Sequence, residues 1–353
     1  MISVRVPATS ANLGPGYDAV GLALSLSMRI SLDRAPYPIV EVYGTGTDLI
    51  PHGPDHPAYR AAQFVAELAG ESYADFHLVQ ENAIPPARGL GGSAAALVGG
   101  AVAANDLLGR SMAAPDLLNL VCELDGHPDN AAPAFLGGLV IGTLTPEGVS
   151  AVRLEPKGLK AVVAVPDFAV STTAARRALP EKVPHKDASF NVGRSGLLLG
   201  ALATGEYDLL RVAMQDRLHQ PYRSHLIPGL EDVIEAAHSS GAYGACLSGS
   251  GPTVLAFASE NDAEKIAAAM HATFEQRDVG AKAWALDVDL SGARVEPPGE
   301  VPASIPVPVM CGQSSPSSTP RWKHWSRSEG RCGVASPRSK RTARAGDAGR
   351  LPG

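Results

Sequence analysis

Cysteine is scarce in this chain of 353 residues, and none of its four cysteines pairs with another in a C-x-x-C motif. We therefore expect neither a disulfide framework nor a zinc site, and the expected environment is a reduced compartment. Only His52 and His56 lie four residues apart, and the prolines and Gly53 around them prevent the helix that would align both side chains on one metal. This segment is expected to be a surface loop.

The chain also lacks a long apolar run. Its longest stretch of small or apolar residues, Ala94–Ala104, has about 11 residues, whereas a membrane-spanning helix needs roughly 20. The first residues contain no cationic region followed by an apolar stretch, as a secretory signal would. These absences favour a cytoplasmic protein without a membrane partner.

Basic residues are scarce except near the end of the chain. Residues 1–299 hold 21 basic and 33 acidic groups, whereas residues 300–353 hold nine basic and three acidic ones. Because nucleic-acid binding requires clustered positive charge, the acidic body argues against a nucleic-acid partner. The last segment is rich in Pro, Ser and Arg and has no hydrophobic periodicity, so we expect residues 298–353 to be a disordered basic tail.

The patterning predicts an α+β protein, and the length suggests roughly two domains, which we place at residues 1–155 and 156–297. Strands are predicted at residues 2–6, 22–32, 38–43, 75–80, 137–143, 149–154, 160–165, twice within 243–258, and at 281–288. Helices are predicted at residues 58–69, 92–108, 115–124, from Asp129 onward, and at 172–178, 189–203, 206–214, 229–239 and 261–275.

The strongest local motif is the glycine-rich segment Pro85–Ala95 (PPARGLGGSAA), which runs directly into an alanine-rich helix. Glycines allow close backbone approach to an anion, and the N–H groups at a helix N-terminus attract phosphate. A phosphate-binding loop and a simple tight turn are both consistent with this composition. The chain contains no Walker motif, and the two prolines before the loop argue against a dinucleotide-binding strand.

Two further glycine-containing motifs lie far from this loop in the sequence. Ala8–Asp18 (ATSANLGPGYD) follows the first predicted strand, and its polar side chains either line a pocket or cap the turn. Leu247–Thr253 (LSGSGPT) lies between two predicted strands. Glycine-rich loops from distant parts of the sequence are able to converge on one polyphosphate.

These motifs, in this order, resemble the GHMP kinase superfamily. The narrower resemblance is to homoserine kinases, because Pro7–Asp18 (PATSANLGPGYD), Gly126–Asn130 (GHPDN) and Asp216–Arg223 (DRLHQPYR) match that family's pattern. The resemblance covers about residues 2–296. It implies an N-terminal α/β domain like ribosomal protein S5 domain 2 and a C-terminal ferredoxin-like α+β domain.

The resemblance implies ATP-dependent phosphorylation of the side-chain hydroxyl of L-homoserine, with Mg²⁺, in threonine biosynthesis. It is also compatible with a homodimer. Two alternatives stay open: a GHMP kinase for another small alcohol such as mevalonate, and a degenerate member that binds nucleotide without catalysis. Phosphoryl transfer demands neutralisation of the triphosphate and alignment of the hydroxyl with the γ-phosphoryl group.

The resemblance also assigns roles to residues of this chain. Ser93 and Asp125 would hold Mg²⁺, while Asn130, Thr172 and Arg176 would lie at the reacting groups, without a strong catalytic base. Substrate contacts are assigned to Asn12, Asp18, Asn130, Arg176 and Arg223. ATP contacts are assigned to Pro86, Ala87, Arg88, Gly89, Leu90, Gly91, Gly92, Ser93, Ala94, Ala95, Gly249 and Ser250.

Simpler interpretations exist for some of these residues. Asp18 would also suit a turn cap, and Asp129 or Asn130 would suit the N-cap of the helix that begins there. Two residues depart from the family pattern: Gly92 replaces a serine of the loop, and Asp125 replaces a glutamate that is one methylene longer. Mg²⁺ demands a near-ideal octahedron, so the shorter side chain changes the reach to the ion.

The terminal segment matches nothing in the family pattern, and we predict that it is dispensable. Deletion of residues 300–353 should leave kinase activity essentially intact, measured as ADP release by the full and truncated chains under one set of conditions. A large loss of turnover or of solubility on truncation would contradict this prediction.

Overall fold

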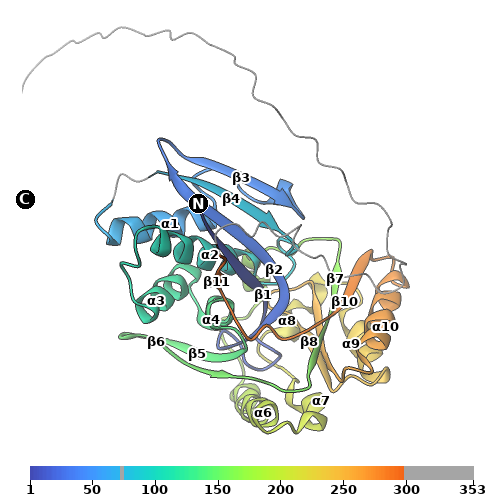
Figure 1. The fold of residues 1–353 in the computed structure, drawn as a ribbon. Coiled ribbons are helices and arrows are strands. Elements are labelled where there is room, and N and C mark those ends of the chain that lie inside the picture. Colours follow the sequence, from blue (N-terminus) through green and yellow to red (C-terminus); the bar gives the residue numbers. More distant parts are fainter. Residues whose placement is uncertain (72–74, 298–353) are drawn as a thin grey trace, which may run out of the picture. The chain divides into compact units, whose positions relative to one another are not determined.

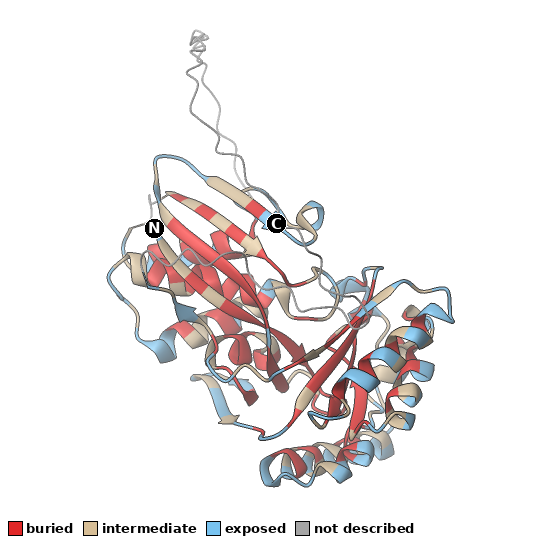
Figure 2. Ribbon diagram, turned by 45° about the vertical axis from the view of Figure 1, so that its right-hand side comes forward, coloured by how far each residue is buried: buried red, intermediate tan, exposed pale blue. Residues whose placement is uncertain are grey.

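The computed structural model describes residues 1–71 and 75–297, and the predicted tail at 298–353 lies outside them (Figure 1). The described residues form two β-sheets with helices packed against them. Figure 2 shows that the strands are mostly buried, whereas many helices expose one side. Within the described residues, no helix is both long enough and apolar enough to cross a membrane.

The larger sheet has seven strands. β1 and β2 are its centre, β3 and β4 pair in parallel at one side, and all other pairs are antiparallel. In β4, buried and partly buried residues alternate, as expected where a sheet buries one face. The strands are β1 (Ile2–Ala11), β2 (Val20–Ala35), β3 (Ile39–Gly44), β4 (Asp75–Asn82), β5 (Leu139–Thr145), β6 (Gly148–Leu154) and β11 (Arg294–Val295).

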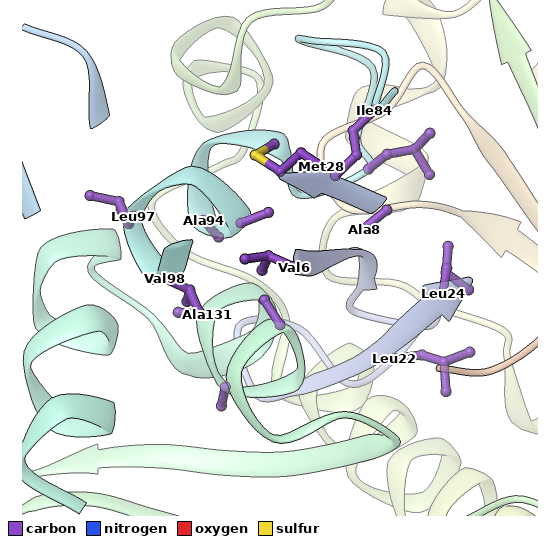
Figure 3. Packing of buried hydrophobic residues seen from close by; sticks show 14 of the residues in the cluster. Val6, Ala8, Leu22, Leu24, Met28, Ile84, Ala94, Leu97, Val98 and Ala131 are labelled. Atoms are coloured by element: carbon purple, nitrogen blue, oxygen red, sulfur yellow. The ribbon is translucent and has the colours of Figure 1, made fainter. Parts of the chain in front are cut away.

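Four helices pack on or near this sheet: α1 (Pro57–Leu68), α2 (Gly92–Leu107), α3 (Ala114–Asp125) and α4 (Pro128–Leu136). Side chains of β1, β2, α2 and α4 gather between strands and helices (Figure 3). The small residues of α2 allow its backbone to approach α1 closely, because a Cβ at Gly100 would overlap the carbonyl group of Ala58. α2 is thus held between the sheet and α1.

The smaller sheet has four antiparallel strands in the order β10 (Ala281–Leu286), β7 (Lys160–Pro166), β9 (Val254–Ala258) and β8 (Gly244–Leu247). Both faces of β7 and β9 are buried, which explains their unbroken apolar sequences. The remaining α-helices of the described residues are α5 (Thr172–Arg177), α6 (His185–Thr204), α7 (Leu210–Ala213), α8 (Gln220–Arg223), α9 (Leu230–Ser239) and α10 (Ala263–Glu275). Three short 3₁₀ helices are Thr47–Leu49, Tyr207–Leu209 and Ser224–Leu226.

The structure corrects several predictions from the sequence. The first strand does not end at residue 6 but continues to Ala11, with a register shift between Pro7 and Ala8, so part of the expected loop is strand. The expected surface loop at His56 is wrong, because this side chain is fully buried and its Nδ1 accepts a hydrogen bond from the N–H of Ala58 at the start of α1. The predicted helix at 206–214 is a 3₁₀ turn followed by α7, and α8 and β11 were not predicted. The domain boundary near residue 155 stays a proposal.

An ion-pair cluster fixes the last described strand to the sheet. Glu296, directly after β11, bonds the Nε of Arg29 at 2.6 Å and the Nη2 of Arg5 at 2.8 Å. Arg29 is only 3% exposed and also pairs with Glu81 at 2.8 Å. Burial of Glu296 favours its neutral form, but hydrogen bonds from Arg29 and Arg5 outweigh burial and lower its pKa.

We predict that Glu296→Gln lowers the free energy of unfolding by about 1–3 kcal/mol, because Arg29 loses one of its two carboxylate partners. A lowered folded-state pKa contributes stability above the unfolded-state pKa and loses it as pH falls through the folded-state value. The difference between wild type and variant should therefore be complete above about pH 5 and shrink below about pH 4. Denaturant titrations across this pH range would measure it.

Glu71→Gln is the matched control, because Glu71 pairs with Arg34 in an exposed position. Equal effects of the two substitutions at neutral pH would show that the buried cluster does not stabilise the fold.

Candidate active site

Three segments that are distant in sequence meet at one junction. The hydroxyl of Ser248, in the β8–β9 turn, donates to the carbonyl oxygen of Gly89 at 2.6 Å and lies 2.8 Å from the hydroxyl of Ser10. Because the Ser248 proton is used on Gly89, Ser10 is the donor in the second contact. The N–H of Gly249 donates to the Ala11 carbonyl at 3.1 Å. The end of β1, the glycine-rich loop and the β8–β9 turn therefore form one hydrogen-bonded unit.

The glycine-rich loop directs the N-terminus of α2 into a cleft. Gly89 and Gly91 have positive φ angles of 75° and 65°, and a Cβ on Gly91 would overlap the Thr9 hydroxyl. Gly91 is the N-cap of α2, so the first free N–H groups of that helix lie beside Gly92 and Ser93 in the cleft wall. The cleft has a volume of about 380 Å³.

The cleft brings together nearly all of the residues selected from the sequence. Of the predicted residues, it is lined by Asn12, Asp18, Ala87, Arg88, Gly89, Leu90, Gly91, Gly92, Ser93, Ala94, Asp125, Asn130, Thr172, Arg176, Arg223, Gly249 and Ser250. Pro86 lines two neighbouring cavities instead, and Ala95 is fully buried in α2. These two side chains are therefore not in the cleft wall.

The sequence reasoning missed several cleft residues. Arg60 and Pro57 come from α1, and Leu124, His127 and Asp129 come from the region where α3 ends and α4 begins. His127 and Asp129 lie inside the quoted GHPDN motif, which was a signal for them. Arg60 lies in an ordinary amphipathic helix, and no sequence signal distinguished it.

Opposite charges face each other at the cleft. The carboxylate of Asp18 lies 3.3 Å from a guanidinium nitrogen of Arg176, and the backbone N–H of Asp18 donates to Asn12 Oδ1 at 3.0 Å. Asn12 also donates to the Gly249 carbonyl at 3.1 Å. It is thus Asn12 that bridges the turn, whereas Asp18 presents its carboxylate to Arg176.

Arg223 is held by a buried network and is only 3% exposed. Its guanidinium donates to the carbonyl oxygens of Ala175 at 3.3 Å and Gly249 at 3.1 Å, and its Nη1 lies 3.2 Å from His219 Nδ1. His219 Nε2 donates to the Gly14 carbonyl at 2.8 Å, so Nδ1 accepts from Arg223. Burial lowers the pKa of His219 and favours this neutral form.

Residues around the start of α4, among them His127 and its acidic neighbours Asp125 and Asp129, also line the cleft. His127 is the N-cap of α4, so the predicted N-cap roles of Asp129 and Asn130 are wrong; Asn130 Oδ1 instead accepts from the Thr9 hydroxyl at 2.8 Å. Burial opposes protonation of His127, but its hydrogen bond with Asp129 and the negative charges of Asp129, Asp125 and Asp18 together outweigh burial and raise the pKa of the imidazole to about 9. Burial raises the pKa of Asp125 to about 6.

Oxygen and nitrogen atoms of Asp18, His127 and Asp129 lie within 4.8 Å of one another, a spacing at which a metal site is conceivable. Here His127 pairs with Asp129, and its imidazole would have to lose its proton and this contact to ligate an ion. The group is therefore an ion-pair cluster. One oxygen of Asp125 is buried and has no hydrogen-bond partner among the described residues.

Comparison with known proteins gives the class of this architecture. The family model for the GHMP kinases N terminal domain matches residues 56–138, and the one for GHMP kinases C terminal matches residues 198–276. The two sheets and the glycine-rich loop are thus those of a GHMP kinase.

Individual relatives narrow this class. The chain is 48% identical over 277 residues to a homoserine kinase of Moorella thermoacetica, covering 78% of this chain and 93% of that protein. A homoserine kinase of Carboxydothermus hydrogenoformans is 46% identical over 264 residues, with coverages of 74% and 87%. The crystal structure of a homoserine kinase from Cytophaga hutchinsonii matches with a TM-score of 0.77 at 32% identity, covering 84% of this chain and 97% of that one. The chain belongs to the homoserine kinase family.

The neighbouring glycines of the loop should respond differently to substitution. Gly91→Ala should lower the free energy of unfolding by about 1–3 kcal/mol, because it combines a positive φ with overlap against Thr9. Gly92→Ser should change it by less than about 0.5 kcal/mol, since the nearest atom to a new Cβ is Ile84 Cγ2 at 3.6 Å. Thermal and denaturant unfolding of both variants would measure the difference, and equal destabilisation would contradict this description of the loop.

Proposed function

We propose that this enzyme transfers the γ-phosphoryl group of ATP to the side-chain hydroxyl of L-homoserine, giving O-phospho-L-homoserine for threonine biosynthesis. One observation carries the proposal: a single cleft joins a helix N-terminus suited to phosphate with a carboxylate and two guanidinium groups suited to a free amino acid. The names of the relatives support the same substrate.

The nucleotide is proposed to lie along the glycine-rich loop. Free N–H groups and the positive end of the α2 dipole face the cleft at Gly92 and Ser93, where they would bind phosphate oxygens. A second cavity of about 210 Å³ shares Ala87, Gly92 and Ser93 with the cleft. Its apolar walls, which include Met28, Leu49, Ile50 and Ile84, suit the base of the nucleotide.

The residues present fit the Mg²⁺ that such a nucleotide carries. Ser93 offers a hydroxyl and Asp125 a carboxylate in the same cleft wall. One oxygen of Asp125 accepts no hydrogen bond from the described residues and lies 3.8 Å from His127 Nδ1, so it retains capacity to bind an ion. Both are hard oxygen ligands of the kind Mg²⁺ prefers. The bound ion would supply neutralising charge at the phosphates.

The amino-acid end of the substrate is proposed to bind where Asp18 faces Arg176. Homoserine carries an ammonium and a carboxylate group. On entering this ion pair, its ammonium group would pair with Asp18 and its carboxylate with Arg176. Arg223 would add a second guanidinium contact to the carboxylate, with its orientation fixed by His219 and backbone carbonyls. Because these contacts require both charges, they favour an amino acid over mevalonate, which has no ammonium group.

Asn130, Thr172 and Arg176 are proposed to position the hydroxyl against the γ-phosphoryl group. Within the described cleft, Asp18 is paired with Arg176 and Asp129 with His127, so neither carboxylate is an unpaired base. The rate would then come from alignment and charge neutralisation.

The cytoplasm is the proposed location, and the two cysteines of the described residues, Cys122 and Cys246, are buried and unpaired as a reduced compartment permits. A homodimer remains part of the proposal by analogy with the family.

A substrate panel tests the proposed reaction. With ATP and Mg²⁺, ADP release should depend on L-homoserine and exceed release with mevalonate by at least about a hundredfold, because mevalonate leaves the charged groups unpaired. A coupled ADP assay with both alcohols, and with no acceptor as background, would measure this ratio.

Two outcomes would overturn the proposal. Activity with mevalonate but not with homoserine would identify a kinase for another alcohol. Nucleotide binding without turnover, with turnover restored in the double variant Gly92→Ser, Asp125→Glu, would identify a degenerate member that retains only the nucleotide site.

A further inference from the structure

Four arginines line the active-site cleft, and three of them are already committed to protein partners. Arg88 donates to the carbonyl oxygens of Pro86 and Pro166, Arg176 pairs with Asp18, and Arg223 is bound in its buried network. Arg60 differs from them. Within residues 1–71 and 75–297, its guanidinium has neither a hydrogen bond nor an ion pair, and its side chain is exposed to the cleft.

The backbone that carries Arg60 is nevertheless firmly held. Its N–H donates to the His56 carbonyl at 2.9 Å in the first turn of α1. The preceding Tyr59 is fully buried, and its hydroxyl lies 3.1 Å from an Asp75 carboxylate oxygen. Close approach of Gly100 to Ala58 fixes this turn against α2, the helix that begins at the glycine-rich loop. The first turn of α1 is thus packed closely against α2, and the Arg60 side chain extends from this packed turn.

The charge of the cleft makes an unpaired cation significant. Its Asp18 and Asp129 are already paired with Arg176 and His127, and among the described residues no lysine lines it. A triphosphate adds several negative charges, which the helix N-terminus and one Mg²⁺ neutralise only in part. A guanidinium free of protein partners is able to form charge-assisted, bidentate hydrogen bonds with phosphate oxygens.

Position along α1 indicates which part of the site Arg60 reaches. Pro57, at the start of α1, lines both the cleft and the second cavity proposed for the base, whereas Arg60, one turn later, lines only the cleft. Arg60 therefore lies outside the cavity proposed for the base and in the cleft that contains the glycine-rich loop.

We propose that Arg60 binds the terminal phosphates of ATP and acts as the mobile cation of this site, an inference that rests on the proposed kinase function. Its guanidinium replaces water at the β- and γ-phosphoryl oxygens and adds positive charge beside them. Arg60 is then a catalytic residue that contacts the transferred group.

Nucleotide titrations of wild type, Arg60→Gln and Arg60→Lys test this inference. Isothermal calorimetry with Mg²⁺ would compare AMP, ADP and a non-hydrolysable ATP analogue. Arg60→Gln should weaken binding of the ATP analogue by about tenfold or more, weaken binding of ADP less, and leave binding of AMP unchanged. Arg60→Lys should recover part of the lost affinity. In steady-state assays, the KM for ATP should rise in Arg60→Gln and the KM for homoserine should not.

Arg211→Gln is the control, because Arg211 is an exposed helical arginine outside the cleft. The role of Arg60 would be overturned if Arg60→Gln bound AMP and the ATP analogue with equally reduced affinity. A higher KM for homoserine with unchanged nucleotide affinity would also overturn it. So would unaltered nucleotide binding in Arg60→Gln beside an active wild type. If wild type itself binds nucleotide but does not phosphorylate homoserine, the proposed substrate fails, while the selective effect on the ATP analogue would still support Arg60.

Discussion

The buried hydroxyl of Ser248 joins the parts of this active site. It donates to the Gly89 carbonyl and accepts from Ser10, so one side chain connects the β8–β9 turn with the glycine-rich loop and the end of β1. Ser248 is fully buried, and loss of its hydroxyl would leave the partly buried Gly89 carbonyl without this donor. The direction of α2, and with it the direction of its free N–H groups, depends on this junction. The geometry of the cleft therefore depends on how the two sheets pack at this junction.

The same junction sets which charged groups remain available. The Gly249 carbonyl accepts from both Asn12 and Arg223, so the turn that holds the loop also orients the Arg223 guanidinium that is proposed to bind the substrate. Arg223 is thereby almost removed from solvent, whereas Arg60 extends into the cleft without a partner among the described residues. In the proposed function, Arg223 would be preorganised for the substrate carboxylate, and Arg60 would be left adaptable for the polyphosphate. The two arginines therefore differ in burial: Arg223 is buried and fixed, and Arg60 is exposed.

Much of this arrangement could be predicted from the sequence, and the failures have physical causes. Periodicity located most strands and long helices, and glycine-rich composition located the loop, because both signals are local. The continuation of β1 through Pro7 to Ala11 was missed because polar, turn-forming residues there pair with β2 across a register shift. The burial of His56 and the exposure of Arg60 to the cleft both depend on how α1 packs, which no local pattern encodes.

The glycine-rich loop tolerates a side chain at one of its neighbouring glycines and excludes it at the other. At Gly92 a side chain would meet only Ile84 at ordinary contact distance, so the missing serine hydroxyl is not imposed by lack of space. At Gly91 the backbone conformation and the neighbouring Thr9 exclude any Cβ. The structure thus requires the glycine that orients the helix N-terminus and tolerates change at the residue that would add a hydroxyl. In the proposed function, phosphate recognition by this loop would therefore rely mainly on backbone N–H groups.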